Sequence, residues 1–423
     1  MLLSVFPLGG IWQFDDVFAR LAIVACAGGH RMPPALTDSA HTPAEQLTGA
    51  HRTLLGACVA HMLHDGYTDL IFVLLPVWRT EFALGYGAVA TLRGIYAGTM
   101  AILQMPSARL AERAGGRPVL VGGTVLAAVG YVLTGFSEGL IGLYAALALS
   151  GAGSSTQHPL ASAAVSRAYG GGARGQLGTY NFAGDLGKAA LPALASLLLT
   201  FLSWRSALPL IACLGLIVAV LIHFLVPPFA IAPDLPAQRA EGAGRGGFAL
   251  LFAIGVLDSG VRMGFLTFLP FLLQAKGAGL PLIGSALTLV FLGGAAGKFA
   301  CGWLGSRYGL LTMVLATEAG TAIGVLAVLA LPLVPALALL PLLGVMLNGT
   351  SSVLYGTVPE LAAPGRVERD FALFYTGVIG SGALSPVLYG VLGDFVGAGW
   401  AVTATAAAAL LTCPLAMLLA PRL

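Results

Sequence analysis

Leu110-Ala-Glu-Arg-Ala-Gly-Gly-Arg117 closes a long apolar segment with an acid, two arginines and paired glycines. A stretch of similar form, Gly302-Trp-Leu-Gly-Ser-Arg-Tyr-Gly309, closes another apolar segment in the second half of the chain. The segments that open the two halves also correspond, since Asp65-Gly-Tyr-Thr-Asp69 in the first is matched by Asp258-Ser-Gly-Val-Arg262 in the second. The chain is therefore expected to hold two copies of one structural unit in tandem.

The composition is that of a protein embedded in a lipid bilayer. Hydrophobic residues make up 57% of the 423 residues and charged residues only 9%, whereas soluble domains have about 45–50% and about 25%. Apolar windows of about 20 residues predict membrane-spanning helices. We expect an all-α membrane protein with twelve transmembrane helices in two pseudo-symmetric six-helix bundles, at about 53–78, 86–108, 118–136, 140–165, 175–202, 205–226, 248–274, 281–304, 310–331, 334–358, 370–392 and 398–420.

These helices divide the chain into four parts. Residues 52–226 are expected to form the first bundle, 248–423 the second, and 227–247 a cytoplasmic linker. Residues 1–51 are expected to be a flexible extension, or translation begins at Met32. Lys and Arg in the predicted loops divide 14 to 3 in favour of the side that holds the N-terminus. Because basic loops stay inside, we expect a multi-pass protein of a bacterial inner membrane with both termini cytoplasmic.

Several classes of protein are disfavoured by what the sequence lacks. It contains no P-loop, no HExxH and no GxSxG, so neither ATP drive nor an enzyme is expected. The five cysteines are scattered without a CxxC, so we expect no disulfide framework and no metal site. The net charge of +3 is too small to indicate a nucleic-acid partner. No cofactor is expected, and the chain is predicted to be a monomer in the bilayer.

A stripe of titratable residues runs along the first predicted helix. His61, Asp65 and Asp69 are spaced four residues apart, which places them on one helical face, with His64 beside them. Buried carboxyl groups favour the neutral form, so such a stripe is typical of proton carriage. His158, before Pro159 in the fourth helix, is a second candidate proton carrier. The alternatives are internal pairing of Asp65 and a structural hydrogen bond from His158 to a carbonyl that the proline frees.

Cations inside apolar segments are costly and are usually retained for a substrate, an ion or a partner charge. Asp185, a further candidate for proton coupling, lies one turn from Lys188, and Asp258 lies one turn from Arg262, so each is expected to form a pair. Arg93 and Lys298 have no acidic neighbour along the sequence, which makes them candidates to bind an anionic substrate unless Asp65 or Asp69 reaches across to them. Arg93 can instead extend to the membrane surface. The four intramembrane cations are Arg93, Lys188, Arg262 and Lys298.

The remaining candidate substrate-binding residues are polar side chains expected to line the space between the halves. His61 is counted among them as well as in the stripe. Glu318, in the ninth predicted helix, is interpreted as structural. The lining residues expected in the second half are Asn348, Tyr355 and Tyr375.

The loop Glu112-Arg113-x-Gly115-x-Arg117 resembles the signature between the second and third helices of the major facilitator superfamily, and Gly302 and Arg307 preserve part of the second copy. The resemblance covers about residues 50–420 and implies the major facilitator fold with alternating access. It also implies that the acid and arginines hold one conformation closed at the cytoplasmic seam. The predicted conformational gate is thus Glu112, Arg113, Arg117 and Arg307.

Shorter motifs resemble one branch of that superfamily. Gly178, Gly187 and Pro192 keep part of the spacing of its antiporter motif. His61-x-x-His64-Asp65, the stretch 151–159 and Asn181-Phe-Ala-Gly184 resemble the fosmidomycin-resistance type of proton-driven exporters. This likeness implies proton-coupled export.

The expected function is that of a secondary active transporter which exports a small anionic compound or drug in exchange for protons. Proton-coupled uptake of an organic anion, or transport of a metal or metal chelate through the histidines, remains an alternative. A non-transporting membrane sensor or scaffold is the alternative of another class. The expected partners are therefore protons, the lipid bilayer and a small anionic substrate.

Overall fold

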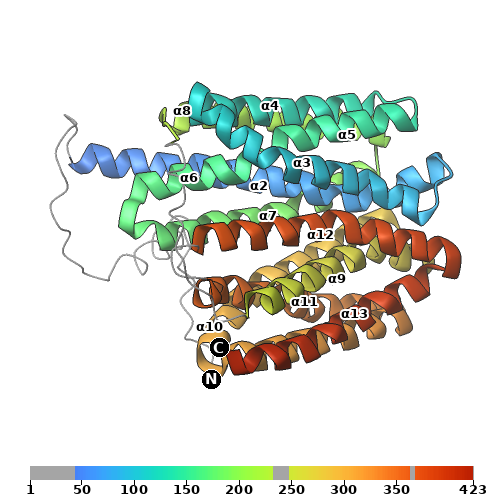
Figure 1. Cartoon of the computed structure of the whole chain (residues 1–423). Coiled ribbons are helices and arrows are strands. Elements are labelled where there is room, and N and C mark those ends of the chain that lie inside the picture. The colour runs from blue at the N-terminus through green and yellow to red at the C-terminus, as the bar shows by residue number, and fades with distance from the viewer. Residues whose placement is uncertain (1–42, 232–246, 363–366, 423) are drawn as a thin grey trace, which may run out of the picture. The chain divides into compact units, whose positions relative to one another are not determined.

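A computed structural model describes residues 43–231, 247–362 and 367–422, almost all of them helical (Figure 1). Residues Gly49–Leu423 form one compact unit, which is described by itself. The helices are α2 (Pro43–Glu81), α3 (Tyr86–Ala114), α4 (Gly116–Gly135), α5 (Leu140–Ser154), α6 (Gln157–Tyr169), α7 (Ala173–Leu198), α8 (Trp204–Leu225), α9 (Phe248–Ala275), α10 (Leu280–Ala330), α11 (Leu333–Leu361), α12 (Val367–Val396) and α13 (Ala398–Leu419).

Each of the twelve predicted spans coincides with helical structure, although three of them, the fourth, eighth and ninth, do not each correspond to one separate helix. The fourth span is divided between α5 and α6, which are separated at Ser155 and Thr156. The eighth and ninth spans both belong to α10, which is kinked at Gly309, where φ is +81°. Only glycine adopts such a backbone conformation without strain, so Gly309 forms the turn between two consecutive spans.

Among the residues that the structure describes, eight helical stretches are long and apolar enough to cross a membrane, in α4 and from α8 through α13. The predicted spans outside this set contain the charged residues of α2, α3 and α7, or are divided into the short α5 and α6. Charge lowers the apolar character of a helix that is nevertheless buried by its neighbours. The count of twelve spans and the division into two six-helix bundles therefore stay predictions.

The predicted N-terminal extension and the predicted linker lie mostly outside the described residues. Most of the predicted extension, 1–42, and most of the predicted linker, 232–246, belong to this undescribed part. The first helix begins at Pro43, inside the stretch predicted as an extension. Proline is favoured in the first turn of a helix, and Ala, Glu, Gln and Leu follow it in the sequence, so the helix extends further than the apolar window.

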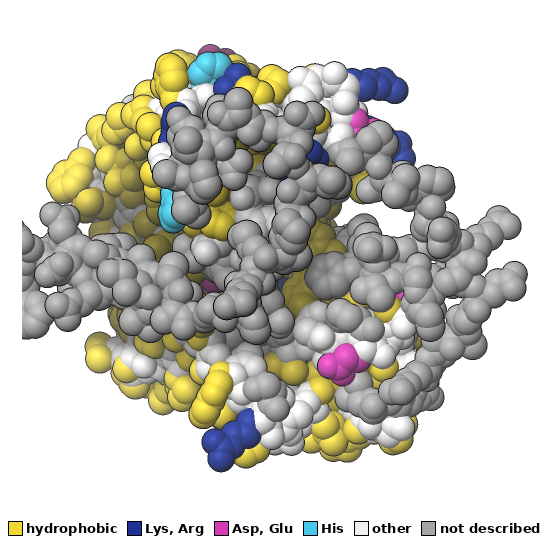
Figure 2. Space-filling view, turned by 90° about the vertical axis from the view of Figure 1, so that its left-hand side faces the viewer, with side chains coloured by type: hydrophobic (Ala, Val, Ile, Leu, Met, Phe, Trp, Pro, Cys, Tyr) yellow, Lys and Arg dark blue, Asp and Glu magenta, His cyan; other side chains and the backbone are white. Residues whose placement is uncertain are grey.

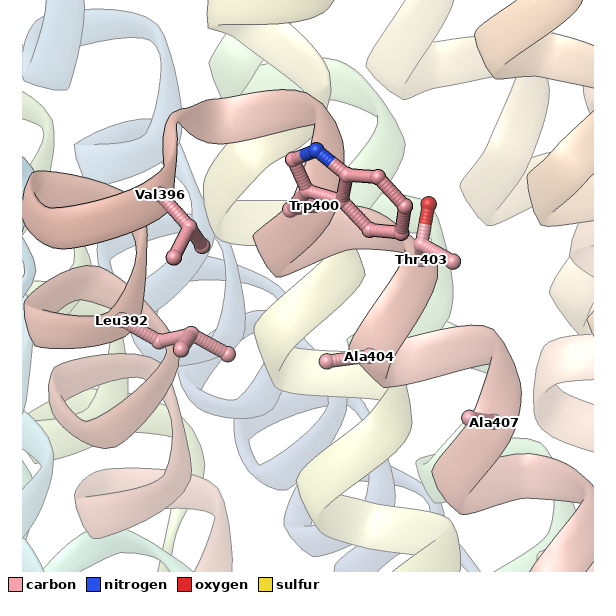
Figure 3. A pocket seen from close by; sticks show the side chains of 6 residues that line it. All are labelled: Leu392, Val396, Trp400, Thr403, Ala404 and Ala407. Carbon is pink, nitrogen blue, oxygen red and sulfur yellow. The ribbon is translucent and has the colours of Figure 1, made fainter.

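The outer surface is apolar. Large hydrophobic side chains such as Ile141, Phe395 and Phe201 are between 79% and 85% exposed, and Figure 2, which looks onto one end of the helices, shows hydrophobic side chains around the rim of the molecule. A shallow groove of about 340 Å³ between α12 and α13 belongs to this surface (Figure 3). Soluble proteins rarely expose so much apolar area, so this surface faces lipid. The groove is lined by Leu392, Val396, Trp400, Thr403, Ala404 and Ala407.

The helices of the unit pack lengthwise against one another, and glycines allow the closest approaches (Figure 1). In the first half α4 packs on α5 and α8, and α3 packs on α5; in the second half α9 packs on α12 and α13, and α10 packs on α11 and α13. A Cβ atom on Gly153 of α5 would collide with the backbone of α4 at Gly123 and Ala127. Small residues at such crossings permit close helix packing in lipid.

The halves meet through α3 with α12 and α7 with α10. Polar contacts join them near the turn between α2 and α3: the backbone N–H groups of Tyr86 and Gly87 donate to the Asp394 carboxylate at 2.6 and 2.9 Å. At the same end, the Ser196 hydroxyl donates to the Leu280 carbonyl. Asp394 thus caps the first turn of α3 from the opposite half, and the halves are closed against each other at this end.

We predict that Gly153→Ala lowers the stability of the protein and that Gly122→Ala does not. The new methyl group at 153 would displace the α4 backbone, which costs about 1–3 kcal/mol. At Gly122 no atom lies within 4 Å of the added carbon, and alanine is favoured over glycine in a helix by up to about 1 kcal/mol. Thermal unfolding of both variants in detergent checks the contrast, and equal melting temperatures would contradict the close α4–α5 packing.

Candidate functional site

Three side chains from three helices converge on Asp65 of α2. The His61 Nε2 atom lies 3.2 Å from Oδ2, the Lys188 Nζ atom 3.1 Å from the same oxygen, and the His158 Nε2 atom 3.6 Å from Oδ1. Asp65 itself is only 9% exposed at its side chain. The structure therefore brings together four residues that the sequence singled out separately.

The contact between His61 and Asp65 requires a proton. The Nδ1 atom of His61 lies 2.9 Å from the backbone carbonyl oxygen of Tyr180, and a carbonyl only accepts, so Nδ1 carries a hydrogen. If that were the sole ring hydrogen, Nε2 would direct its lone pair at a carboxylate oxygen. The observed 3.2 Å contact is favourable only when a proton lies between the two atoms, on either the imidazole or the carboxyl group.

Gly184 of α7 provides the space for this pair. A Cβ atom added there would lie 2.6 Å from His61 Nε2 and 2.7 Å from Asp65 Oδ2. The ring of Tyr180, one turn earlier on the same helix, stacks on the His61 ring with a centroid distance of 4.1 Å. Sequence reasoning missed Tyr180, although the nearby motif 181–184 pointed to this turn of α7.

Asp185 is shared between two lysines. Its Oδ1 atom lies 2.6 Å from Lys298 Nζ and 3.5 Å from Lys188 Nζ. The expected pair of Asp185 with Lys188 is present, and Lys298, which has no acidic neighbour along the sequence, has Asp185 as its partner from another helix. Lys298 comes from α10 in the second half, and a distant acid of this kind is invisible to a search for neighbours along the sequence. The Asp185–Lys298 ion pair thus connects the halves.

Arg93 of α3 is buried, with 3% of its side chain exposed, and does not extend to the membrane surface. Its guanidinium lies 3.7 Å from the Asp69 carboxylate and 4.5 Å from the centre of the Phe72 ring. It also donates to the carbonyl oxygen of Gly382 at 3.3 Å across the two halves. Asp69 from the stripe on α2 therefore supplies the counter-charge of Arg93, which is the alternative that the sequence left open.

The charges of this centre balance. With neutral histidines, each of the three carboxylates lies within 4.0 Å of at least one of the three cations. The shared proton of His61 and Asp65 then adds one positive charge. The acids are Asp65, Asp69 and Asp185, and the cations are Arg93, Lys188 and Lys298.

His64 lies outside this centre, in a closed hydrogen-bond chain between helices. Its ring nitrogens lie 3.0 Å from the Ser154 and Thr124 hydroxyl oxygens. The Thr124 hydroxyl donates its hydrogen to the Leu120 carbonyl oxygen, so it accepts a hydrogen bond from His64 Nε2. The Ser154 hydroxyl is also hydrogen-bonded to the Tyr96 hydroxyl. A neutral His64 satisfies every partner. The structure thus favours a structural role, and a role in proton coupling stays only a prediction.

The acid–base pair predicted in the second half is not formed as expected. Asp258 is hydrogen-bonded to Glu318, which also bonds Thr350. Arg262 instead donates to the Ser351 hydroxyl at 3.4 Å. The helical spacing allowed a pair on α9, but Asp258 has its hydrogen-bond partner on a neighbouring helix, α10. Two hydrogen-bonded carboxyl groups must share a proton, so Glu318 is more than a remote structural residue.

The other predicted lining residues occupy α11 and α12. Asn348 donates to the Gly344 carbonyl oxygen of its own helix at 3.1 Å. The rings of Tyr355 and Tyr375 lie 6.2 Å apart.

The predicted gate residues lie at the end of the unit opposite the Asp394 cap. Arg117 donates to the His223 carbonyl oxygen at 3.4 Å within its own half, and Arg307 stacks on neighbouring Tyr308. Within the described residues, neither they nor Glu112 and Arg113 form an ion pair with the other half. Their role as a gate stays a prediction.

One group of side chains has the composition of a metal site. His61, Asp65 and His158 offer ligand atoms within 4.8 Å of one another. The Lys188 ammonium, however, already lies against the Asp65 oxygen that faces His61. A metal ion would have to displace this cation, so the arrangement is better suited to a proton than to a metal ion.

The fold and this charged centre are those of a membrane transporter. The family model of the Major Facilitator Superfamily matches residues 57–252 and 250–423, so the chain belongs to that superfamily. It is a multi-pass membrane protein and not an enzyme. The narrower likeness to fosmidomycin-resistance exporters stays a prediction.

Curated relatives include transporters of different kinds. The chain is 30% identical over 315 residues to Monocarboxylate transporter 11 of Homo sapiens, which covers 68% of this chain and 65% of that protein. It is 36% identical over 87 residues, 20% of its length, to the Inner membrane transport protein YajR of Escherichia coli (strain K12). The chain thus spans just under two thirds of the length of the human relative.

Solved structures share the fold. A bacterial homologue of the human lysosomal transporter Spinster, in an inward-facing and occupied conformation, superposes with a TM-score of 0.74 at 16% identity, over 88% of this chain and 96% of that chain. The nucleoside transporter NupG gives 0.72 at 12% identity, over 87% and 99%. At this level of identity the likeness concerns the fold alone.

We predict that Asp69→Asn destabilises the protein strongly and that Asp69→Asn with Arg93→Gln recovers much of the loss. The single variant leaves a buried guanidinium without its counter-charge, which costs about 3–5 kcal/mol. Glu81→Gln is the matched control, because Glu81 and Arg205 form an exposed pair worth about 0–1 kcal/mol. Unfolding in detergent measures all three, and a double variant no more stable than Asp69→Asn would show that the pair is not coupled.

Proposed function

We propose that this chain is a proton-coupled secondary transporter of a small organic anion. The observation that carries the proposal is the contact between His61 and Asp65, which needs a proton and lies within 3.1 Å of a lysine ammonium. A proton site beside a cation is the combination that links proton binding to anion binding. Alternating access between the two halves would then move both across the membrane.

The charge balance favours movement of proton and anion in the same direction. Without the shared proton the centre is neutral, so a bound anion would leave an excess negative charge in a buried site. With the proton the centre has one positive charge, which an anion neutralises. A ligand shifts a protein only toward the state that it binds better, so the anion should stabilise the proton-bearing state, and under an inward proton gradient the result is uptake.

The curated relative supports a carboxylate as the substrate. Monocarboxylate transporter 11 is named for one-carboxylate compounds, and a monoanion matches the single extra charge of the proton-bearing site. The substrate class proposed for this chain is therefore a small monocarboxylate. The partly exposed lysines Lys188 and Lys298 are the cations accessible to it, with 28% and 32% of their side chains exposed.

Export in exchange for protons, as the motifs of α2, α5 and α7 suggest, is the second candidate. It would require that substrate and proton compete for the site instead of binding together. A cationic drug would compete in this way, since it would be repelled by the protonated centre. The same reconstituted protein distinguishes the two cases through the sign of the proton flux that the substrate causes.

The proposed location is a bacterial inner membrane with both termini in the cytoplasm, supported by the distribution of arginine in the loops. In this orientation the end closed by Asp394 faces outward, and the predicted gate faces the cytoplasm. The conformation would then be open to the inside, with the chain acting as a monomer.

We predict that Asp65→Asn abolishes proton-driven accumulation of a small monocarboxylate in proteoliposomes, to the level of liposomes without protein. Asparagine preserves shape and hydrogen bonding but cannot exchange a proton. Glu138→Gln, at an exposed acid, is the matched control and should accumulate substrate normally. Exchange of labelled for unlabelled substrate should survive in Asp65→Asn, because it needs no net proton movement.

Two results would contradict the proposal. Gradient-driven accumulation by Asp65→Asn at the wild-type rate would exclude Asp65 as the proton site. Substrate-driven proton movement in the opposite direction to the substrate, in the wild-type protein, would favour export by exchange instead.

A further inference from the structure

Two lysines stand out in the charged centre because their side chains are partly exposed. Lys188 and Lys298 are exposed over 28% and 32% of their side chains, whereas Asp65 and Asp185 are each at 9%. One lysine belongs to α7 in the first half and the other to α10 in the second half. A ligand that enters the site therefore meets one ammonium group from each half.

The two ammonium groups are held at a separation that suits one carboxylate. Both contact the same atom, Asp185 Oδ1, at 3.5 and 2.6 Å, so the two nitrogens are at most 6.1 Å apart, the sum of these distances. A carboxylate placed between two ammonium groups bonds one with each oxygen or both with one. Asp185 already makes the second of these arrangements.

We infer that Lys188 and Lys298 form the binding site for the carboxylate of the substrate, and that Asp185 occupies this site with its own carboxylate until a substrate replaces it. This inference rests on the proposed function, which supplies the anionic substrate. Asp185 acts as an internal counter-ion that spares both lysines the cost of an unpaired buried charge. The substrate takes over the same two bonds and with them the connection between the halves.

Lys188 connects this site to the proton. Its ammonium lies between two carboxylates, 3.1 Å from Asp65 and 3.5 Å from Asp185. When a proton is shared by His61 and Asp65, part of the Asp65 charge is already neutralised, so Lys188 is more available to an incoming anion. When the proton leaves, Asp65 regains its full charge and holds Lys188 more strongly. The proton thereby controls one of the two cations that the substrate needs.

The charge of the site limits the ligand to one carboxylate. One proton and one monoanion together leave the balance of the centre unchanged, whereas a dianion would leave an unmatched negative charge in a buried environment. A neutral analogue of the same shape would not replace Asp185 on either lysine. The site is therefore specific for monocarboxylates over dicarboxylates and amides.

Chemical rescue of Asp185→Asn tests this inference. The variant removes the internal carboxylate and leaves Lys298 without its closest partner, so we expect a lower melting temperature than that of the wild type. Acetate should raise that melting temperature much more in Asp185→Asn than in the wild type, because the site is vacant. Acetamide, which has the same shape without the charge, and chloride at equal ionic strength should not.

Asp394→Asn is the matched control, because Asp394 also joins the halves but is held by backbone N–H groups and not by lysine. Acetate should not rescue it. If acetate stabilises Asp185→Asn no more than acetamide does, or rescues Asp394→Asn equally well, the inference is wrong.

A second variant keeps the test decisive if Asp185→Asn does not fold. Asp185→Asn with Lys298→Gln removes both members of the pair that joins the halves, so it should fold but show no response to acetate. An acetate response in this double variant would overturn the assignment of Lys298. Binding of acetate needs no proton gradient, so the two proposals can fail separately. If acetate does not rescue Asp185→Asn but the wild type shows proton-driven transport, only the lysine site is refuted. If acetate rescues the variant but the wild type shows no proton-driven transport, only the proton coupling is refuted.

Discussion

The structure depends on the neutralisation of charges buried between helices, and Asp65 has the central part in it. This one carboxylate contacts two histidines and a lysine from three helices. An unpaired charge in such a place would cost several kcal/mol, so α2, α6 and α7 are held in positions that keep these partners together. The cost explains why Gly184 is needed, since a larger residue would separate His61 from Asp65.

The same requirement connects the two halves of the chain. Asp185 pairs with Lys298, Arg93 donates to Gly382, and Asp394 caps α3. The first two contacts lie at the charged centre and the third at one end of the unit. Lys188 lies between Asp65 and Asp185, so under the proposed function a proton at Asp65 would alter the Asp185–Lys298 contact that joins the halves.

The fold was largely predictable from the sequence, because apolar segments and their repetition depend on each residue and its near neighbours. The segments of α4 and α8–α13 and the turn at Gly309 belong to this class. Spacing along a helix correctly paired Asp185 with Lys188, but it could not predict the pairs between helices: it paired Asp258 with Arg262, whereas α10 offered Glu318, and Arg93 and Lys298 have acids on other helices. His64 was selected by its position in the stripe, yet the hydroxyl groups of Thr124 and Ser154, which satisfy it, come from α4 and α5.

The most direct test of the account is the number of protons that move when an anion binds. Purified protein in weakly buffered detergent solution is mixed with a small monocarboxylate, and the pH of the medium is recorded together with binding. The account predicts uptake of up to one proton for each anion bound, because the anion stabilises the proton-bearing pair of His61 and Asp65, and no uptake in Asp65→Asn. Release of protons on binding, or binding with no proton movement at any pH, would contradict it.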